Sequence, residues 1–228
     1  MSKGKILFVV TNDGRKLGPD GNTTGWYLPE VAHPYDVLTK EGYEIDYVSP
    51  KGGEAPMDVG SGKMFKDDIC QAFLKDEVQV SRLKNTHTAA QINAADYKAL
   101  FYAGGHGPMF DLPDALDIAE LAAKIYKQGG VLSAVCHGTV GFVPVKVDGN
   151  SLVDKQTVTC FTNAEEDEVG LSKAMPFMLE TKLKELGAIF KGGKNWDCNV
   201  QVSGKLITGQ NPASATEVGK QMVILLAK

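Results

Sequence analysis

The most constraining stretch of this sequence is a short apolar run that ends in Cys-His-Gly. Residues 129–141 read Gly-Gly-Val-Leu-Ser-Ala-Val-Cys-His-Gly-Thr-Val-Gly. The run 131–135 has the apolar character of a buried strand, and small residues typical of a helix follow Cys136. A strand-to-helix elbow exposes its central side chain at the carboxyl end of a strand, where open α/β folds bind ligands. The stretch therefore predicts an α/β protein with Cys136 at a functional edge.

The residues around Cys136 favour a reactive thiol. At such an elbow the sulfur lies over the first turn of the next helix, whose free N–H groups and positive dipole end stabilise a thiolate. The alternative is a buried cysteine that ends a core strand, because free cysteine packs like a small apolar residue. The adjacent His137 and Gly138 favour the nucleophile.

Strand-like and helix-like segments alternate along the chain. This order predicts a mostly parallel central sheet flanked by helices, formed by one domain that spans residues 1–228. Strands are expected at 5–10, 43–50, 97–102, 131–135 and 156–161, and hairpins at 145–150 and 200–208. Helices are expected at 26–40, 116–125, 176–186 and from 213 onward, short helices that cover one face within 51–93, and a surface loop at 15–24.

Composition excludes several classes of protein. With 43% hydrophobic residues, 23% charged residues and a net charge of −4, the chain resembles an ordinary soluble protein without the basic patch of a nucleic-acid binder. Its four cysteines include no C-x-x-C pair, which favours a reducing compartment. The first apolar run is too short for a membrane span, so we expect a cytoplasmic protein, with the nucleus as an alternative. No histidine has metal-ligand spacing, and no metal site is predicted.

Other chemical groups fall near predicted strand ends. The turn Gly104-Gly105-His106-Gly107 offers unobstructed N–H groups for an oxyanion, or is a plain turn. Glu30, at the start of the first helix, either approaches the Cys136 sulfur or only compensates the helix dipole. The acidic run 165–168 either begins a solvated helix or supplies one carboxylate that orients His137.

Three motifs together resemble one known group of proteins. The segments 134–138 (Ala-Val-Cys-His-Gly), 103–107 (Ala-Gly-Gly-His-Gly) and 28–34, which contains Glu30, are similar to the ThiJ/PfpI superfamily. The closer similarity is to the glutathione-independent glyoxalase III enzymes of its fungal-type heat-shock chaperone branch, and it extends over nearly the whole chain to residues 208–214. The resemblance implies a flavodoxin-like three-layer sandwich that forms a homodimer.

The resemblance also implies roles for individual residues. Cys136 is the nucleophile, Glu30 is hydrogen-bonded to it, and His137 is the partner histidine. The carboxylate that orients His137 matches Glu168, although Glu165 and Glu166 compete for that role. The N–H groups of Gly105 and His137 match the oxyanion donors.

The implied reaction converts a small 2-oxoaldehyde, methylglyoxal, and water to D-lactate without a cofactor or a metal. Alternatives are a cysteine peptidase, a protein or nucleotide deglycase, and a non-enzymatic holdase for unfolded client proteins that also senses oxidants through Cys136. A glutaminase-type amidotransferase is disfavoured because no histidine follows His137.

Overall fold

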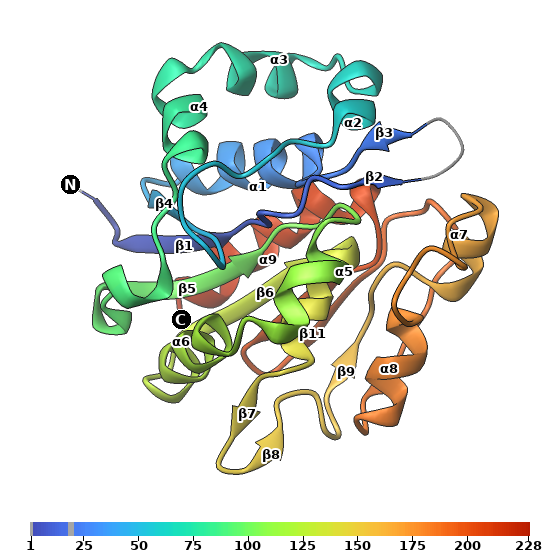
Figure 1. Ribbon diagram of the computed structural model, residues 1–228. Coiled ribbons are helices and arrows are strands. Elements are labelled where there is room, and N and C mark those ends of the chain that lie inside the picture. Colours follow the sequence, from blue (N-terminus) through green and yellow to red (C-terminus); the bar gives the residue numbers. More distant parts are fainter. Residues whose placement is uncertain (1, 18–20) are drawn as a thin grey trace.

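A six-stranded sheet forms the centre of the computed structural model, which describes residues 2–17 and 21–228 (Figure 1). Its strand order is β11-β12-β6-β5-β1-β4, and only the pairing of β11 with β12 is antiparallel. The predicted mostly parallel sheet is therefore confirmed. The strands span Lys5–Val9 (β1), Glu44–Val48 (β4), Tyr97–Tyr102 (β5), Val131–Val135 (β6), Val200–Ser203 (β11) and Leu206–Gly209 (β12).

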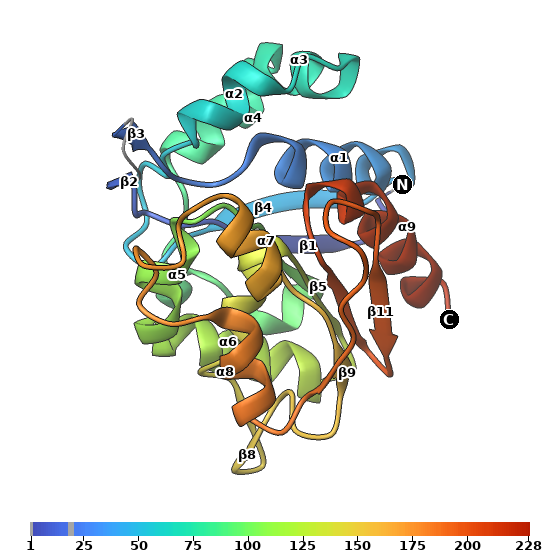
Figure 2. The same ribbon diagram turned by 90° about the vertical axis from the view of Figure 1, so that its right-hand side faces the viewer.

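Helices cover both faces of this sheet. Successive side chains of the central strands point to opposite faces, so Leu7 and Leu100 enter one core while Phe8 and Phe101 enter the other. The first core packs against α6 and the second against α1 and α9, as Figures 1 and 2 show. These layers confirm the predicted sandwich. The covering helices are Leu28–Lys40 (α1), Pro108–Asp111 (α5), Leu116–Lys127 (α6) and Ala215–Leu226 (α9).

Three short helices form an outer layer: two of them pack on α1, and the third packs on the edge strand β4 (Figure 2). They are α2 (Val59–Met64), α3 (Asp68–Lys75) and α4 (Glu77–Lys84), and an aspartate side chain caps the first turn of each. We call these three helices the outer cover. Among the described residues, no helix is long and apolar enough to cross a bilayer.

The remaining elements are short. The predicted strand 156–161 is wrong in length, because only Thr157–Val158 (β9) pairs, with Ile189–Phe190 (β10) and outside the main sheet. The N–H of Thr159, the residue after β9, donates to the Thr208 hydroxyl and not to a strand partner. The other short elements are Lys146–Val147 (β7), Asn150–Ser151 (β8), Asn163–Glu168 (α7), Leu179–Glu185 (α8), Ala89–Gln91 (η1), Ala94–Asp96 (η2), Leu112–Asp114 (η3) and Pro212–Ser214 (η5).

The predicted loop at 15–24 is partly a small antiparallel ribbon. Lys16–Leu17 (β2) pairs with Asn22–Thr23 (β3), and residues 18–20 lie outside the described residues.

The elbow after β6 packs directly on the neighbouring strand β5. It continues as the predicted helix, which is a 3₁₀ helix at Cys136–Phe142 (η4). A Cβ at Gly138 would overlap the carbonyl oxygen of Tyr102, and one at Gly141 would overlap the Tyr102 ring. Glycine at these positions therefore lets the turn lie against β5, which holds Cys136 at the carboxyl edge of the sheet.

This contact predicts the effect of Gly138→Ala. The added methyl group meets rigid backbone, so the variant should lose about 1–3 kcal/mol of unfolding free energy in chemical denaturation. The matched control is Gly60→Ala in α2, where the nearest atom is the Asp58 carboxylate oxygen at 3.2 Å and alanine favours the helix. Equal stability of Gly138→Ala and the parent protein would contradict the packing argument.

Candidate active site

Cys136 forms the tip of the elbow. Its φ of 59° lies in the left-handed region, which is unusual for a residue with a side chain and recurs at functional sites. The residue is only 4% exposed. The position confirms the predicted strand–elbow geometry and brings the sulfur to a small enclosed space.

That space is a cavity of about 80 Å³ at the carboxyl ends of β5 and β6. It has room for one small molecule, since a cavity of about 10–15 Å³ already holds a water. Its wall combines aromatic and aliphatic side chains with the groups that carry chemistry. The lining residues are Tyr27, Glu30, Gly105, His106, Cys136, His137, Phe161, Val169, Trp196 and Pro212.

A larger groove of about 760 Å³ lies at the other end of the sheet, beside Lys98, Gly129 and Lys205. No cysteine, histidine or carboxylate lines it within the described part of the chain. The smaller cavity is therefore the candidate active site, because the reactive groups converge there.

His137 connects the sulfur to a carboxylate. Its Nδ1 lies 3.4 Å from Cys136 Sγ, and its Nε2 lies 2.5 Å from Glu166 Oε2. A carboxylate only accepts hydrogen bonds, so Nε2 carries the hydrogen and Nδ1 is left to accept the thiol proton. Burial and the neighbouring His106 lower the pKa of His137, and the Glu166 charge only partly offsets them. The imidazole is therefore neutral at neutral pH and available as a base.

The expected partner Glu168 is wrong: Glu166 is the carboxylate that contacts His137. Glu168 lies on the exposed side of α7, where it accepts hydrogen bonds from Asn195 Nδ2 at 2.8 Å and from the indole Nε1 of Trp196 at 2.9 Å. Since Trp196 lines the cavity, Glu168 fixes part of the cavity rim and not the imidazole.

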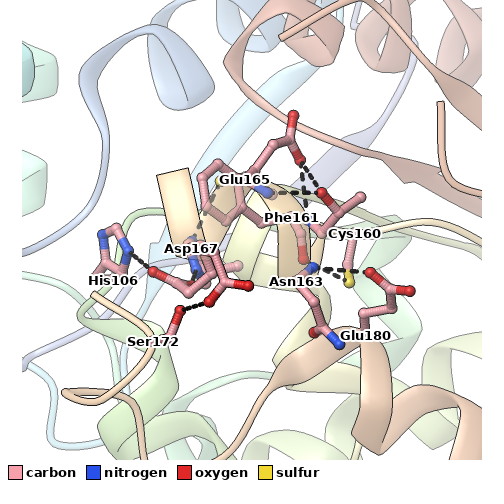
Figure 3. A network of polar contacts seen from close by, with 12 residues as sticks. His106, Cys160, Phe161, Asn163, Glu165, Asp167, Ser172 and Glu180 are labelled. Atoms are coloured by element: carbon pink, nitrogen blue, oxygen red, sulfur yellow. Dashed lines mark hydrogen bonds and ion pairs between the residues drawn. The ribbon is translucent and has the colours of Figure 1, made fainter. Parts of the chain in front are cut away.

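Glu165 anchors α7. Its Oε2 accepts from both the N–H and the hydroxyl of Thr162, which forms a capping box, and its Oε1 accepts from Gln210 and Asn211. Figure 3 labels Glu165 and the side chain of His106, which lies beside α7. The anchor turns Glu166 towards the histidines. The expected solvated helix start is therefore wrong for Glu165 and Glu166, which are both buried.

One local signal in the sequence pointed to this arrangement. Thr162-Asn163-Ala164-Glu165 matches the capping-box pattern, which assigns Glu165 to the helix terminus and leaves Glu166 and Glu168 for other contacts. The pattern does not determine whether Glu166 or Glu168 contacts His137, because that depends on where α7 docks.

His106 is a site residue that sequence reasoning did not assign. Its Nε2 lies 2.9 Å from Glu166 Oε1, so Glu166 bridges two imidazoles. The His106 and His137 rings lie 4.2 Å apart, and Phe161 packs on His137 at 4.4 Å between centroids. The His137 ring thus contacts both rings, whose own centroids lie 6.1 Å apart. Burial favours the neutral acid, but the contacts with both histidines hold the pKa of Glu166 below its ordinary range.

Glu30 projects into the cavity from the first turn of α1. The Tyr27 N–H donates to the Gly104 carbonyl and the Leu28 N–H donates to Ser61, which fixes the helix start. A Cβ on Gly104 would overlap Glu30 Oε2 and lie 2.9 Å from Cys136 Cβ. Only glycine at 104 therefore lets this carboxyl group approach the cysteine. Both Glu30 oxygens are buried and lack a well-aligned hydrogen-bond partner among the described residues.

Glu30 and Cys136 compete to hold a charge. Burial raises the pKa of Glu30 well above its ordinary value, although contacts with the Cys136 thiol and the Gly104 N–H favour the ionised form. Burial and the Glu30 charge raise the pKa of Cys136, and only the His137 N–H opposes them. The expected lowering of the thiol pKa by a helix dipole is therefore wrong. The pair carries at most one negative charge at neutral pH.

The expected oxyanion donors border the sulfur. Gly105 adopts a φ of 98°, and a Cβ there would overlap the Gly25 carbonyl oxygen, so this turn requires glycine. Among the described residues, the Gly105 N–H has no protein acceptor. The His137 N–H faces Cys136 Sγ. Both residues line the cavity that contains the sulfur, and their role as oxyanion donors stays a prediction.

His106, His137 and Glu166 offer three ligand atoms within 4.8 Å of one another. Their hydrogen bonds position His137 beside the Cys136 sulfur, so we assign these three groups to the thiol.

The elbow, the enclosed thiol and the His137–Glu166 pair define a cysteine-dependent α/β protein with a site for a small molecule. The chain belongs to the DJ-1/PfpI family, whose model matches residues 25–224. It is 35% identical to a glutathione-independent glyoxalase of Schizosaccharomyces pombe, over 99% of both chains.

Two solved structures are similar over the whole chain. The 24 kDa rapid encystment protein of Francisella tularensis has a TM-score of 0.92 and 36% identity, and 99% of each chain is covered. Glyoxalase III of Candida albicans has a TM-score of 0.91 and 29% identity, with 98% of this chain and 97% of that chain covered.

The buried carboxyl group of Glu30 predicts a stability effect of Glu30→Gln. Because the folded-state pKa is raised, the folded protein binds more protons than the unfolded chain, and stability falls as pH rises above about 4.5. The glutamine amide does not ionise, so the variant loses no stability at this position as the pH rises. The variant should melt a few degrees above the parent protein at pH 7–8, each kcal/mol being worth about 2–4 °C, and the difference should vanish below pH 4.

Glu165→Gln is the matched control for thermal melting. Glu165 is equally buried, but its oxygens accept hydrogen bonds that an amide cannot all accept, so this variant should melt below the parent protein. A Glu30→Gln protein that melts lower than the parent at every pH would show that the carboxyl group stabilises the fold.

Proposed function

We propose that this protein is a glutathione-independent glyoxalase that converts methylglyoxal and water to D-lactate. The observation that carries the proposal is the convergence of Cys136, Glu30 and the His137–Glu166 pair on a closed cavity of about 80 Å³. This volume suits an aldehyde of five non-hydrogen atoms. The glyoxalase names of the relatives in Schizosaccharomyces pombe and Candida albicans support the same reaction.

The first step forms a carbon–sulfur bond. His137 Nδ1 takes the thiol proton across 3.4 Å while Sγ attacks the aldehyde carbon. The N–H groups of Gly105 and His137 stabilise the alkoxide, which takes its proton from the Glu30 carboxyl group and leaves His137 protonated. The product is a neutral hemithioacetal. The sulfur no longer competes for charge, so Glu30 is free to be a carboxylate.

The second step moves a proton between neighbouring carbons. Glu30 removes a proton from the former aldehyde carbon while His137 protonates the ketone oxygen, which gives an enediol. Glu30 then returns its proton to the adjacent carbon, and His137 takes the proton of the hydroxyl on the former aldehyde carbon. The aldehyde carbon is oxidised to a thioester and the ketone carbon is reduced to an alcohol, so no external oxidant or reductant is needed. Water hydrolyses the lactoyl thioester and regenerates Cys136.

The same thiol and imidazole also suit a peptidase or a deglycase. The cavity argues against both, because Cys136 is 4% exposed and an extended peptide or a modified protein side chain needs an open groove. An oxidant-sensing role is also weakened, since it requires a thiol with a lowered pKa. Homodimer formation and holdase activity towards unfolded clients stay predictions that rest on the family resemblance.

The primary test measures D-lactate formed from methylglyoxal without glutathione. The parent protein should turn over many times, and Cys136→Ala should lose at least about 1,000-fold in kcat, because no other thiol reaches the cavity. Cys198→Ala is the control, since this exposed cysteine lies outside the site. Equal turnover by Cys136→Ala would remove the thiol from the mechanism, and absence of lactate from the parent would exclude the substrate.

Replacing Glu166 and Glu168 separately by glutamine tests which carboxylate orients His137. Glu166→Gln should lower kcat by about 10²–10⁴-fold, because the acceptor that fixes the His137 tautomer is lost. Glu168→Gln keeps an oxygen that can accept from Trp196 and should change kcat less than tenfold. The reverse order of effects would assign the orienting role to Glu168.

A further inference from the structure

Outside the active site, three side chains of different chemistry meet between α1 and the outer cover. His33 comes from α1, and Asp67 and Cys70 come from the start of α3. His33 Nε2 lies 3.1 Å from Asp67 Oδ1 and 3.7 Å from Cys70 Sγ, and all three atoms lie within 4.8 Å of one another. Asp67 Oδ1 also accepts from the Cys70 N–H at 3.1 Å as the N-cap of α3, and the proposed reaction requires none of the three side chains.

The distances match those expected around one tetrahedral zinc ion. Zinc binds imidazole nitrogen and carboxylate oxygen at about 2.0–2.2 Å and thiolate sulfur at about 2.3 Å. Tetrahedral angles then separate nitrogen from oxygen by about 3.3 Å and nitrogen from sulfur by about 3.5 Å. The observed separations of 3.1 and 3.7 Å differ from these by about 0.2 Å.

We propose that His33, Asp67 and Cys70 bind a Zn²⁺-class divalent transition metal that ties the outer cover to α1. The thiolate selects a soft or borderline ion and excludes Mg²⁺ and Ca²⁺. One thiolate and one carboxylate neutralise the two positive charges, which suits a partly buried position. Cys70 is fully buried while the side chains of His33 and Asp67 are 19% and 41% exposed, so the fourth position opens to water.

A second catalytic triad is the main alternative for these residues. Cys70 is fully buried, so a substrate cannot reach the sulfur. Metal binding replaces the thiol proton, which is released to water, and forms the metal–sulfur bond.

The position also has a structural consequence. His33 lies three residues after Glu30, one turn further along α1. The outer cover otherwise reaches α1 through contacts such as that between Phe73 and Tyr35, whose ring centroids lie 5.2 Å apart. In Figure 2, α3 lies over α1. A metal at His33 would therefore tie α3 to α1, the helix that positions the Glu30 carboxyl group.

The test is a titration of the metal-stripped full chain with Co²⁺, which reports a thiolate ligand through its charge-transfer absorption. The unaltered protein and Cys136→Ser should each bind one equivalent with this band. Cys70→Ser should lose the band, and His33→Gln should weaken binding at least tenfold. Both substitutions keep hydrogen-bonding groups, and unchanged melting temperatures without metal would show that both variants remain folded.

Zn²⁺ supplies the second measurement and Cys198→Ser the matched control. Zn²⁺ should raise the melting temperature of the unaltered protein and of Cys198→Ser but not that of Cys70→Ser, and Mg²⁺ should raise none of them. Loss of the Co²⁺ band in Cys136→Ser instead of Cys70→Ser would assign the metal to the active site and overturn the proposal. Absence of saturable binding would also overturn it.

Discussion

The candidate active site depends on burying at most one negative charge between two acidic groups. Glu30 comes from the first turn of α1 and Cys136 from the end of β6, and the two meet beside Gly104, where a side chain would separate them. Their shared burial makes a second charge costly, so one group must be neutral, as a protonated acid or as sulfur bonded to carbon, before the other can ionise. This constraint makes His137 necessary as a base, and it explains why a buried carboxyl group without a good partner persists near the sulfur.

The helix α7 shows how neighbouring residues of one type take different tasks. Glu165 is bound by donors from both sides and fixes the helix. Glu166, one position later, faces the two imidazoles, and Glu168 returns to the outer side and holds Trp196. Because a helix turns about 100° per residue, the anchor at 165 determines which glutamate can reach His137. The orientation of the imidazole thus depends on contacts made far from the cysteine.

The cavity connects this network to the proposed chemistry. Phe161 packs on the His137 ring and Trp196 packs on Phe161, with 5.6 Å between the latter centroids. These rings exclude water and keep the space small. A reaction that proceeds within one small molecule fits such a space, since proton transfer between adjacent carbons needs fixed groups and no second substrate. The outer cover packs on α1, the helix that carries Glu30.

The sequence by itself determined the central strands, the elbow and the adjacency of Cys136 and His137. These features are local: buried apolar runs, glycines in tight turns and neighbouring positions in the chain. Only the tertiary structure decided that Glu166 and not Glu168 orients His137, that His106 joins them, and that the Cys136 pKa is raised. The first two depend on how α7 docks against residues about 45 positions away, and the third on burial. Neither docking nor burial is encoded in the spacing of the residues themselves.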